Sequence, residues 1–129
     1  MTMDSQPLRI SHESQEDLLF VTVEGLVEIP YLTRYVTSHQ VVWKKYPGIL
    51  WDLRDIDPSR ITSDDVLNLH HSFAEIAHLR SGGRTALLVS TDLELIAKIA
   101  VALCETHHTP IELKTFLDEN EAIGWLKAT

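Results

Sequence analysis

Ala86 to Val89 is an unbroken run of apolar residues within the segment TALLVS, and it constrains the fold of this chain more than any other feature. A short apolar run without alternation is typical of a central parallel strand, because both faces of such a strand are covered. Successive parallel strands must be joined by a crossover connection, which is usually a helix. The run therefore predicts an α/β fold, and it is far too short to cross a bilayer.

Strand-like and helix-like patterns alternate along the rest of the sequence. Residues 8–14 and 18–25 are joined by a short polar turn and predict a β-hairpin. Further strands are expected at 49–53, at 85–90 and, as an edge strand opened by a proline, at 110–116. About four helices are expected, namely from Pro30 towards Trp43, from Ser63 to Leu79, from Thr91 to Cys104, and after Asp118. The order ββαβαβαβα implies a mixed sheet of about five strands with right-handed crossovers.

Particular residues specify where several helices begin and end. Thr91 and Glu94 match the capping-box pattern at the start of the third expected helix. Asp118 and Glu121 are expected to cap the last one in the same way. Gly82, which follows the second expected helix, offers a residue that adopts a left-handed conformation without strain.

The length and composition fit one compact domain. The chain has 129 residues and a mean hydropathy of −0.03, and it contains no repeat, low-complexity tract or flexible linker. Residues 1–7 are expected to form a flexible tail, and residues 8–129 a single domain. The polar start MTMDSQP lacks the features of a secretory signal, and the lone Cys104 excludes an internal disulfide. Both observations favour a cytoplasmic protein.

The charge balance limits the classes of partner. The formal net charge is −8 at pH 7. Nucleic-acid binding requires clustered lysine and arginine to neutralise phosphates, so the charge argues against a nucleic-acid partner. It argues equally against an anionic membrane surface. A protein partner or a small ligand remains, and a homodimer is left open.

The stretch ILWDLRDIDPSRITSDDV, residues 49–66, joins a buried strand to a helix through a loop rich in acids, arginines and hydroxyls. This loop follows the carboxyl end of a central parallel strand, and the loop after the expected strand 85–90 lies beside it. Ligands of open α/β sheets bind at this edge of the sheet. A ligand, partner or phosphorylation site is therefore expected here. Its candidate residues are Arg54, Ser59, Arg60, Thr62, Ser63 and Thr91.

A structural role explains part of the same loop without any site. Thr62 or Ser63 stands where a helix must begin, and its hydroxyl can accept a hydrogen bond from a backbone N–H of the first turn. Asp64 and Asp65 interact favourably with the positive end of the helix dipole. Helix capping is therefore the favoured interpretation of these residues, and phosphorylation is the alternative.

Two groups of residues are weighed as metal ligands. His71, Glu75 and His78 share one face of a helix, but that face lies opposite the apolar one and offers no enclosure for zinc. Four acids near the strand ends offer oxygen ligands for a hard cation, namely Asp52, Asp55, Asp57 and Asp92. Asp52, however, is expected to pair with Arg54 or Arg84. No metal and no other cofactor is therefore expected, and Cys104 is expected to be an inert buried thiol.

The sequence shows no catalytic motif. It contains no nucleophile-elbow serine and no Walker loop, and Gly82-Gly83 precedes a strand instead of opening a helix. Its tryptophans and tyrosines occur at helical and strand spacing, which is typical of core residues. A pocket lined by these aromatic residues, suited to a lipid or another apolar ligand, is the alternative.

The order of elements and several segments resemble the STAS superfamily, most closely its SpoIIAA-like group. The resemblance runs from Leu8 to Leu126 and is carried by VEGLVEIPYLTRYV, ILWDLRDID, SRITSDD, GGRTALLVSTDLE and FLDENEAIGWL. It implies a domain that binds proteins or small ligands and is not an enzyme. The SpoIIAA-like group also resembles the CRAL-TRIO lipid-exchange fold, which implies a possible apolar pocket.

The resemblance also implies a switch. In anti-sigma-factor antagonists, a serine or threonine at the start of the helix after the expected strand 49–53 is phosphorylated, and this blocks binding. The family pattern is Asp-Ser-Ser/Thr-Gly, whereas this chain has Thr62-Ser63-Asp64-Asp65. A hydroxyl is retained, but the preceding aspartate and the following glycine are not. The acids after the hydroxyl would also repel an added phosphate.

These observations rank three hypotheses. The first is a STAS-like regulatory module that docks a protein partner through the loop and helix after 49–53. The second is a domain that binds a small apolar ligand or lipid, and the third is a hydrolase or metal enzyme. An exposed apolar patch beside Ile61 would favour the first, and an enclosed cavity above about 300 Å³ would favour the second.

Overall fold

The structure is a computed structural model that describes residues 7–128. The strands are β1 (Arg9–Gln15), β2 (Leu18–Leu26), β3 (Gly48–Asp57), β4 (Arg84–Leu88) and β5 (Glu112–Phe116). The α-helices are α1 (Ile29–Ser38), α2 (Gln40–Trp43), α3 (Ser63–Ala77), α4 (Glu94–Thr106) and α5 (Glu119–Lys127). Two 3-10 segments, η1 (His78–Arg80) and η2 (Thr91–Leu93), adjoin α3 and α4. The predicted tail, residues 1–7, lies outside the described residues except for Pro7.

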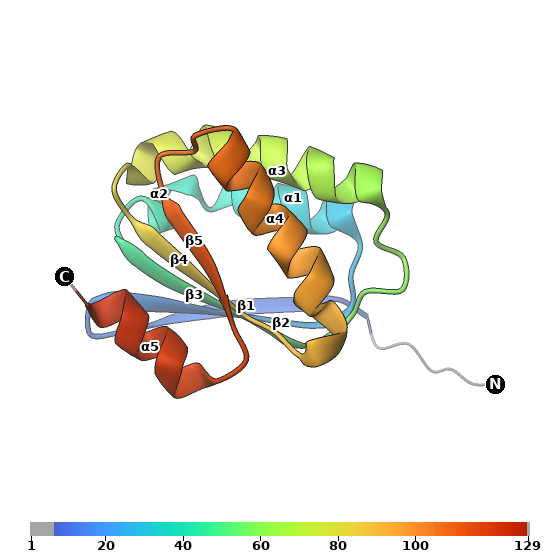
Figure 1. Cartoon of the computed structure of the whole chain (residues 1–129), viewed down its shortest axis with the longest axis horizontal. Coiled ribbons are helices and arrows are strands. Elements are labelled where there is room, and N and C mark those ends of the chain that lie inside the picture. The colour runs from blue at the N-terminus through green and yellow to red at the C-terminus, as the bar shows by residue number, and fades with distance from the viewer. Residues whose placement is uncertain (1–6, 129) are drawn as a thin grey trace.

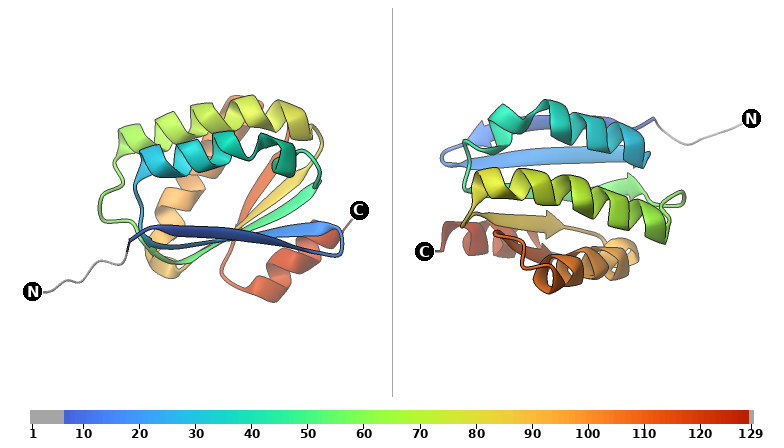
Figure 2. Two further views of the ribbon diagram at one scale, coloured as in Figure 1. Left: turned by 180° about the vertical axis from the view of Figure 1, so that it is seen from behind. Right: turned by 90° about the horizontal axis from the view of Figure 1, so that it is seen from above.

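The strands form one sheet in the order β1-β2-β3-β4-β5. The hairpin β1–β2 is antiparallel, whereas β2, β3, β4 and β5 run parallel to one another. Helices α1 to α4 cover one face of the sheet, and α5 lies on the opposite face (Figures 1 and 2). The predicted mixed α/β sheet is confirmed, with β4 inside the sheet and β5 at its edge. No helix between residues 7 and 128 is long and apolar enough to cross a membrane.

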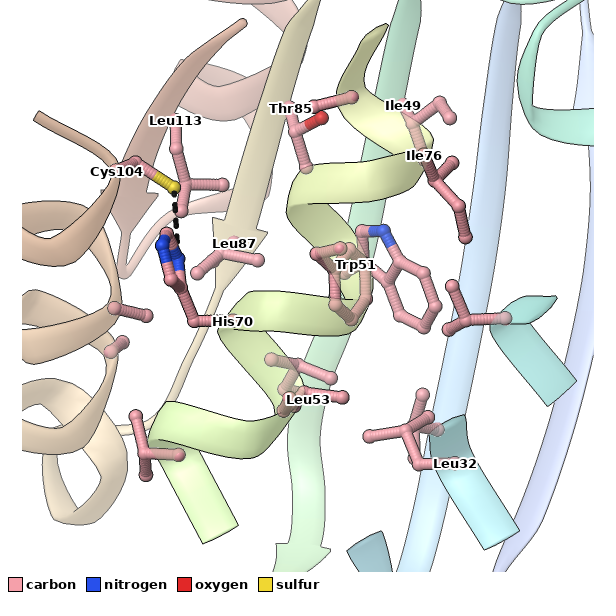
Figure 3. Close-up of a pocket in the computed structure, with 18 of the residues that line it drawn as sticks. Leu32, Ile49, Trp51, Leu53, His70, Ile76, Thr85, Leu87, Cys104 and Leu113 are labelled. Atoms are coloured by element: carbon pink, nitrogen blue, oxygen red, sulfur yellow. Dashed lines mark hydrogen bonds between the residues drawn. The ribbon is translucent and has the colours of Figure 1, made fainter. Parts of the chain in front are cut away.

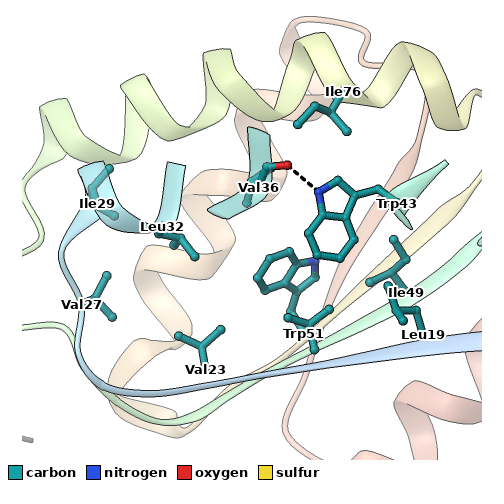
Figure 4. Close-up of a cluster of buried hydrophobic side chains, with 11 residues drawn as sticks. Leu19, Val23, Val27, Ile29, Leu32, Val36, Trp43, Ile49, Trp51 and Ile76 are labelled. Carbon is teal, nitrogen blue, oxygen red and sulfur yellow. Dashed lines mark hydrogen bonds between the residues drawn. The ribbon is translucent and has the colours of Figure 1, made fainter. Parts of the chain in front are cut away.

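The core has two layers because successive residues of a strand point to opposite faces. Ile49 and Trp51 of β3 face α1, α2 and α3, where they pack with Trp43 (Figure 4). Leu50, between them in sequence, packs instead against Leu126 of α5. The indole N–H of Trp43 donates to the Val36 carbonyl at 2.7 Å, so its buried polar atom is satisfied.

The first expected helix is divided in two, which the sequence pattern did not predict. Its start is as predicted, with Pro30 in the first turn. At His39 the backbone leaves the helical region, with φ −112° and ψ 24°. The Nδ1 atom of the His39 ring lies 2.8 Å from the Tyr35 carbonyl oxygen. A carbonyl oxygen only accepts hydrogen bonds, so the ring N–H of His39 is the donor. In a continuous helix the backbone N–H of residue 39 would bond this same Tyr35 carbonyl, and the ring replaces it.

The helix ends differ in how well they were predicted. Asp118 caps α5 as expected, since its carboxylate accepts from the Glu121 N–H at 3.1 Å. The capping box predicted for Thr91 and Glu94 is wrong, because Thr91 opens the 3-10 segment η2 and α4 starts at Glu94 without a side-chain cap. Gly82 has φ +85°, as predicted for a left-handed position.

A buried arginine closes the end of the sheet where β3 and β4 begin. The Arg80 guanidinium donates to the carbonyl oxygens of Tyr46, Pro47 and Arg84 at 3.1 Å each. It also donates to the Thr85 hydroxyl at 2.7 Å. Burial lowers the pKa of Arg80 to about 10. The single side chain of Arg80 thus provides hydrogen-bond donors for three backbone carbonyl oxygens at this end of the sheet.

Candidate functional site

The loop between β3 and α3 is held by local hydrogen bonds. The Ser59 N–H donates to the Asp57 carboxylate at 3.0 Å, and the Ile61 N–H donates to the Pro58 carbonyl at 3.0 Å. These bonds form consecutive tight turns of the kind that aspartate and proline favour. These turns hold the backbone of the loop from Asp57 to Ile61.

Thr62 is the N-cap residue of α3. Its hydroxyl accepts from the Asp65 N–H at 3.1 Å, and the Asp65 carboxylate accepts from the Thr62 N–H at 3.0 Å. Together these bonds form a capping box, with aspartate in the place usually taken by glutamate or glutamine. The predicted capping role is confirmed for Thr62. The neighbouring Ser63 is exposed, and its hydroxyl makes no hydrogen bond within the described chain.

Arg54 points away from this loop. Its guanidinium bonds the Asp52 carboxylate at 2.8 and 3.0 Å and contacts Glu119 of α5 at 3.0 Å. Burial alone would raise the pKa of Asp52, but the hydrogen bonds from Arg54 outweigh it and hold that pKa below its ordinary value. The predicted pairing of Asp52 with Arg54 is confirmed. Arg54 therefore links β3 to the face of the sheet that carries α5.

The other predicted site residues lie exposed near the carboxyl ends of β3 and β4. Ser59, Arg60 and Thr91 are all exposed. Arg60 makes only a long, 3.9 Å contact with the Glu28 carboxylate across the surface, so its side chain remains available. The structure thus keeps most of the predicted set at one end of the sheet and separates Arg54 from it.

Apolar side chains are exposed on the two neighbouring helices. Leu67 of α3 is 40% exposed, and Leu95 and Ile99 of α4 are 73% and 47% exposed. Ile61, in the loop before α3, is half-buried and packs against the core. Single exposed leucines are common, but exposed apolar residues on adjoining elements are typical of contact surfaces.

A cavity of about 170 Å³ lies between the sheet and the helices α1, α3 and α4 (Figure 3). Its lining is almost entirely apolar, and none of the six predicted site residues belongs to it. The candidate residues of the β3–α3 loop therefore lie outside this cavity.

A histidine pair that sequence reasoning missed lies beside the cavity. His70 of α3 is only 6% exposed, and its Nε2 atom lies 2.9 Å from Nδ1 of His107 at the end of α4. Burial, reinforced by His107 and His71, lowers the pKa of His70. The helical period contained the signal, because residue 70 follows Val66 by four positions on the inward side of α3. His71, by contrast, is exposed as predicted.

Cys104 completes this corner of the cavity. Its sulfur lies 4.0 Å from Nδ1 of His70, and burial raises the pKa of the thiol. The residue is half-buried, not fully buried as predicted. The nearby Thr109 hydroxyl lowers the pKa of the Cys104 thiol, but burial has the larger, opposite effect. The Thr109 hydroxyl is itself buried, and no atom in the described chain meets the geometry of a hydrogen bond with it. Among residues 7–128, no group of three or more histidine, cysteine or acidic side chains is arranged to hold a metal ion.

Comparison with solved structures identifies the fold. An uncharacterized protein of the DUF3478 family from Shewanella loihica, described as having a SpoIIAA-like fold, superposes with a TM-score of 0.59 at 20% identity, over 98% of each chain. An anti-sigma factor antagonist from Mycobacterium paratuberculosis superposes with a TM-score of 0.63 at 14% identity, over 95% of this chain and 96% of that one. No protein-family model matches the sequence, and no curated protein matches it either. The chain therefore has a SpoIIAA-like fold, as its sequence predicted.

Proposed function

We propose that this protein is a non-enzymatic regulatory module that docks a protein partner. The contact surface is the end of the β3–α3 loop, residues 59–63, together with the exposed side of α3 at Leu67, and we call it the docking surface. The observation that carries the proposal is the combination of exposed side chains with a fixed backbone. Ser59, Arg60 and Ser63 are exposed, while the turns and the capping box hold the main chain beneath them.

A fixed backbone matters because ordering a loop on binding costs conformational entropy. The loop already has its turn hydrogen bonds before any partner arrives. Leu67 then supplies apolar area one turn into the helix, beside the polar rim of Arg60 and Ser63. A partly exposed leucine within a polar rim is the usual composition of a protein–protein contact.

The charge of the surface indicates the kind of partner. Asp55 and Asp64 flank the docking surface and are exposed, and the whole chain carries a net charge of −8. A partner with a basic, partly apolar contact face would be complementary. Because the superposed Mycobacterium paratuberculosis protein is an anti-sigma factor antagonist, we take anti-sigma factors as the partner class to test first.

Phosphorylation is not part of the proposed mechanism. The Thr62 hydroxyl is engaged in the capping box, which leaves Ser63 as the free hydroxyl of the pair. Asp64 and Asp65 follow directly, and their carboxylates would repel an added phosphate. We propose that Thr62 acts as a helix cap and that the docking surface works without a phosphate switch.

The proposal is tested by calorimetric titration of the purified protein with the anti-sigma factors of its source organism. Leu67→Asp should weaken binding at least about tenfold, which corresponds to roughly 1.4 kcal/mol. Leu79→Asp is the matched control, because Leu79 is 46% exposed but lies in the 3-10 segment η1, beyond the far end of α3. Equal losses in both variants, or no binding to any anti-sigma factor, would contradict the proposal.

The second hypothesis, a domain that binds a small apolar ligand or lipid, has less support. The cavity of about 170 Å³ is below the roughly 300 Å³ that such ligands need. No observation favours the third hypothesis, a hydrolase or metal enzyme. A cytoplasmic location and a homodimer remain predictions.

A further inference from the structure

The outer edge of β5 carries backbone groups that no other strand pairs with. β5 is the last strand of the sheet, and among residues 7–128 no strand lies beside its outer edge. The Glu112 N–H and the Phe116 carbonyl form hydrogen bonds to the residues that flank β4, so both direct their backbone groups into the sheet. Because this direction alternates along a strand, Leu113 and Thr115 direct their N–H and C=O groups outwards. An edge of this kind is a template for pairing with another chain.

A groove follows this edge, and in the view of Figure 1 the strand runs between α4 and α5. Val101 and Glu105 of α4 line the groove on one side, and Trp125 of α5 lines it on the other. The apolar lining residues Val101, Leu113 and Trp125 are only partly buried. A strand seated on the edge would therefore cover apolar side chains and also pair the outward backbone groups.

The side chains of β5 alternate between the two faces of the sheet. Leu113 points towards the helices, where it lines the cavity between the sheet and α4. Glu112 and Lys114 lie on the opposite face, which carries α5, and both are exposed. On that face Glu112 contacts Arg84 at 3.6 Å. The Lys114 ammonium lies 5.4 Å from the centre of the Phe116 ring. The edge thus presents an acid and a base on one face, two residues apart.

Two copies of this strand are complementary when they pair antiparallel about a two-fold axis. The hydrogen-bonded pairs form between residues with outward backbone groups, such as Leu113 and its copy. With Leu113 opposite its copy, Glu112 of each chain lies opposite Lys114 of the other, at positions where side chains approach closely. Shifting one strand by two residues places Glu112 opposite its copy, or Lys114 opposite its copy, and both arrangements are repulsive. The charges therefore favour one register.

We propose that the protein forms a symmetric dimer in which the β5 strands of two copies pair antiparallel in this register, so that the two sheets become continuous. A second copy fits the edge because the strand carries both charges of each pair, and a two-fold axis forms each contact twice. The net charge of −8 opposes association, but repulsion between charges more than about 8 Å apart is largely screened at physiological ionic strength. The dimer surface shares no residue with the docking surface, so the proposal does not rest on the proposed function.

Sedimentation equilibrium of the full-length protein over a concentration series is the first test. The wild type should dimerise with a dissociation constant on the order of 100 μM, because an interface built on one short strand is small. Glu112→Lys and Lys114→Glu should each weaken the homodimer at least about tenfold, because both cross-strand contacts become like-charge pairs. The two variants change the net charge in opposite directions, so a loss in both does not arise from net charge.

Combining the two substitutions tests the register. The double variant Glu112→Lys/Lys114→Glu should dimerise like the wild type, because each pair is restored with its charges exchanged. An equal mixture of the two single variants should form heterodimers for the same reason. Glu13→Lys is the matched control, since Glu13 is an exposed acid on the other edge strand, β1, and its replacement should leave association unchanged. Urea unfolding of each variant confirms that it is folded.

Hydrogen exchange locates the contact. The Leu113 and Thr115 amides should exchange about fourfold more slowly at roughly 1 mM protein than at roughly 10 μM, as a dissociation constant on the order of 100 μM requires. The Lys114 amide, which faces β4, should be equally protected at both concentrations. A wild type that stays monomeric at about 1 mM would overturn the proposal. A double variant as weak as the single ones, or a dimer that leaves Leu113 and Thr115 unprotected, would overturn it as well.

Discussion

Replacing Thr62 with alanine tests the structural role of the loop most directly. The change removes the hydroxyl that accepts from the Asp65 N–H at 3.1 Å. The reciprocal bond, from the Thr62 N–H to the Asp65 carboxylate, does not require the hydroxyl and can persist. One N–H of the first helical turn therefore loses its acceptor, and because the site is exposed, water replaces part of the interaction.

The expected cost is about 1 kcal/mol of unfolding free energy, within the range measured for lost N-caps. For a domain of this size, that corresponds to a fall in Tm of roughly 3–6 °C. Thr62→Asp should be nearly neutral, since aspartate also caps. Ser63→Ala should change stability by less than about 0.5 kcal/mol, because the Ser63 hydroxyl makes no hydrogen bond within the described chain.

Urea unfolding of the wild type and these three variants measures the differences, with the slope m expected to stay constant. A larger loss for Ser63→Ala than for Thr62→Ala would refute the assignment of the cap. Mass spectrometry of protein from its native host supplies a second test. Stoichiometric phosphate on Thr62 or Ser63 would show that the loop is a switch after all.

Three further predictions concern stability. Gly124→Ala should stabilise the protein by about 0.5–1 kcal/mol, because this helical glycine has open space around it. Gly83→Ala should destabilise the protein in the same urea assay, because the new Cβ would lie 2.8 Å from the Pro47 carbonyl oxygen. The pKa of His70 is lowered in the folded state, so the protein should lose stability as the pH drops below the ordinary histidine value of 6.5. The urea midpoint should therefore fall more between pH 7.5 and pH 5 in the wild type than in His70→Gln. Arg80→Met should cost more than about 2 kcal/mol in thermal and urea unfolding, because buried carbonyl oxygens lose their donors; an unchanged midpoint would contradict this.

The sheet was predictable from the sequence because its strands carry their own burial signals. The run from Ala86 to Val89 indicated an internal parallel strand, and β4 is internal. The start of the first helix at Pro30 and the cap at Asp118 depend on local chemistry, and both were predicted correctly. The break at His39 was not, because it arises from a side chain competing with the backbone for one carbonyl.

The candidate site was less predictable because it depends on packing. Arg54 was grouped with the loop from its position in the sequence, but the alternation along β3 places it with Asp52 and turns both towards α5. Thr91 matched a capping pattern that a 3-10 turn displaced. The cavity was anticipated only as an alternative, a pocket lined by aromatic residues, and Trp43 and Trp51 do line it. Its volume could not be predicted, because it is what remains after side chains from six or more elements have packed.

The guanidinium of Arg80 has a consequence for how the molecule opens. Its acceptors belong to the segment before β3 and to the first residues of β4, which are separated in sequence by more than thirty positions. Neither segment can move away without leaving a buried cation or a buried carbonyl unpaired, so the two should open only together. Amide hydrogens at the start of β3 and β4 should therefore exchange with solvent at one common, slow rate. Those of the edge strand β1, which pairs with β2 alone, should exchange faster through local fraying.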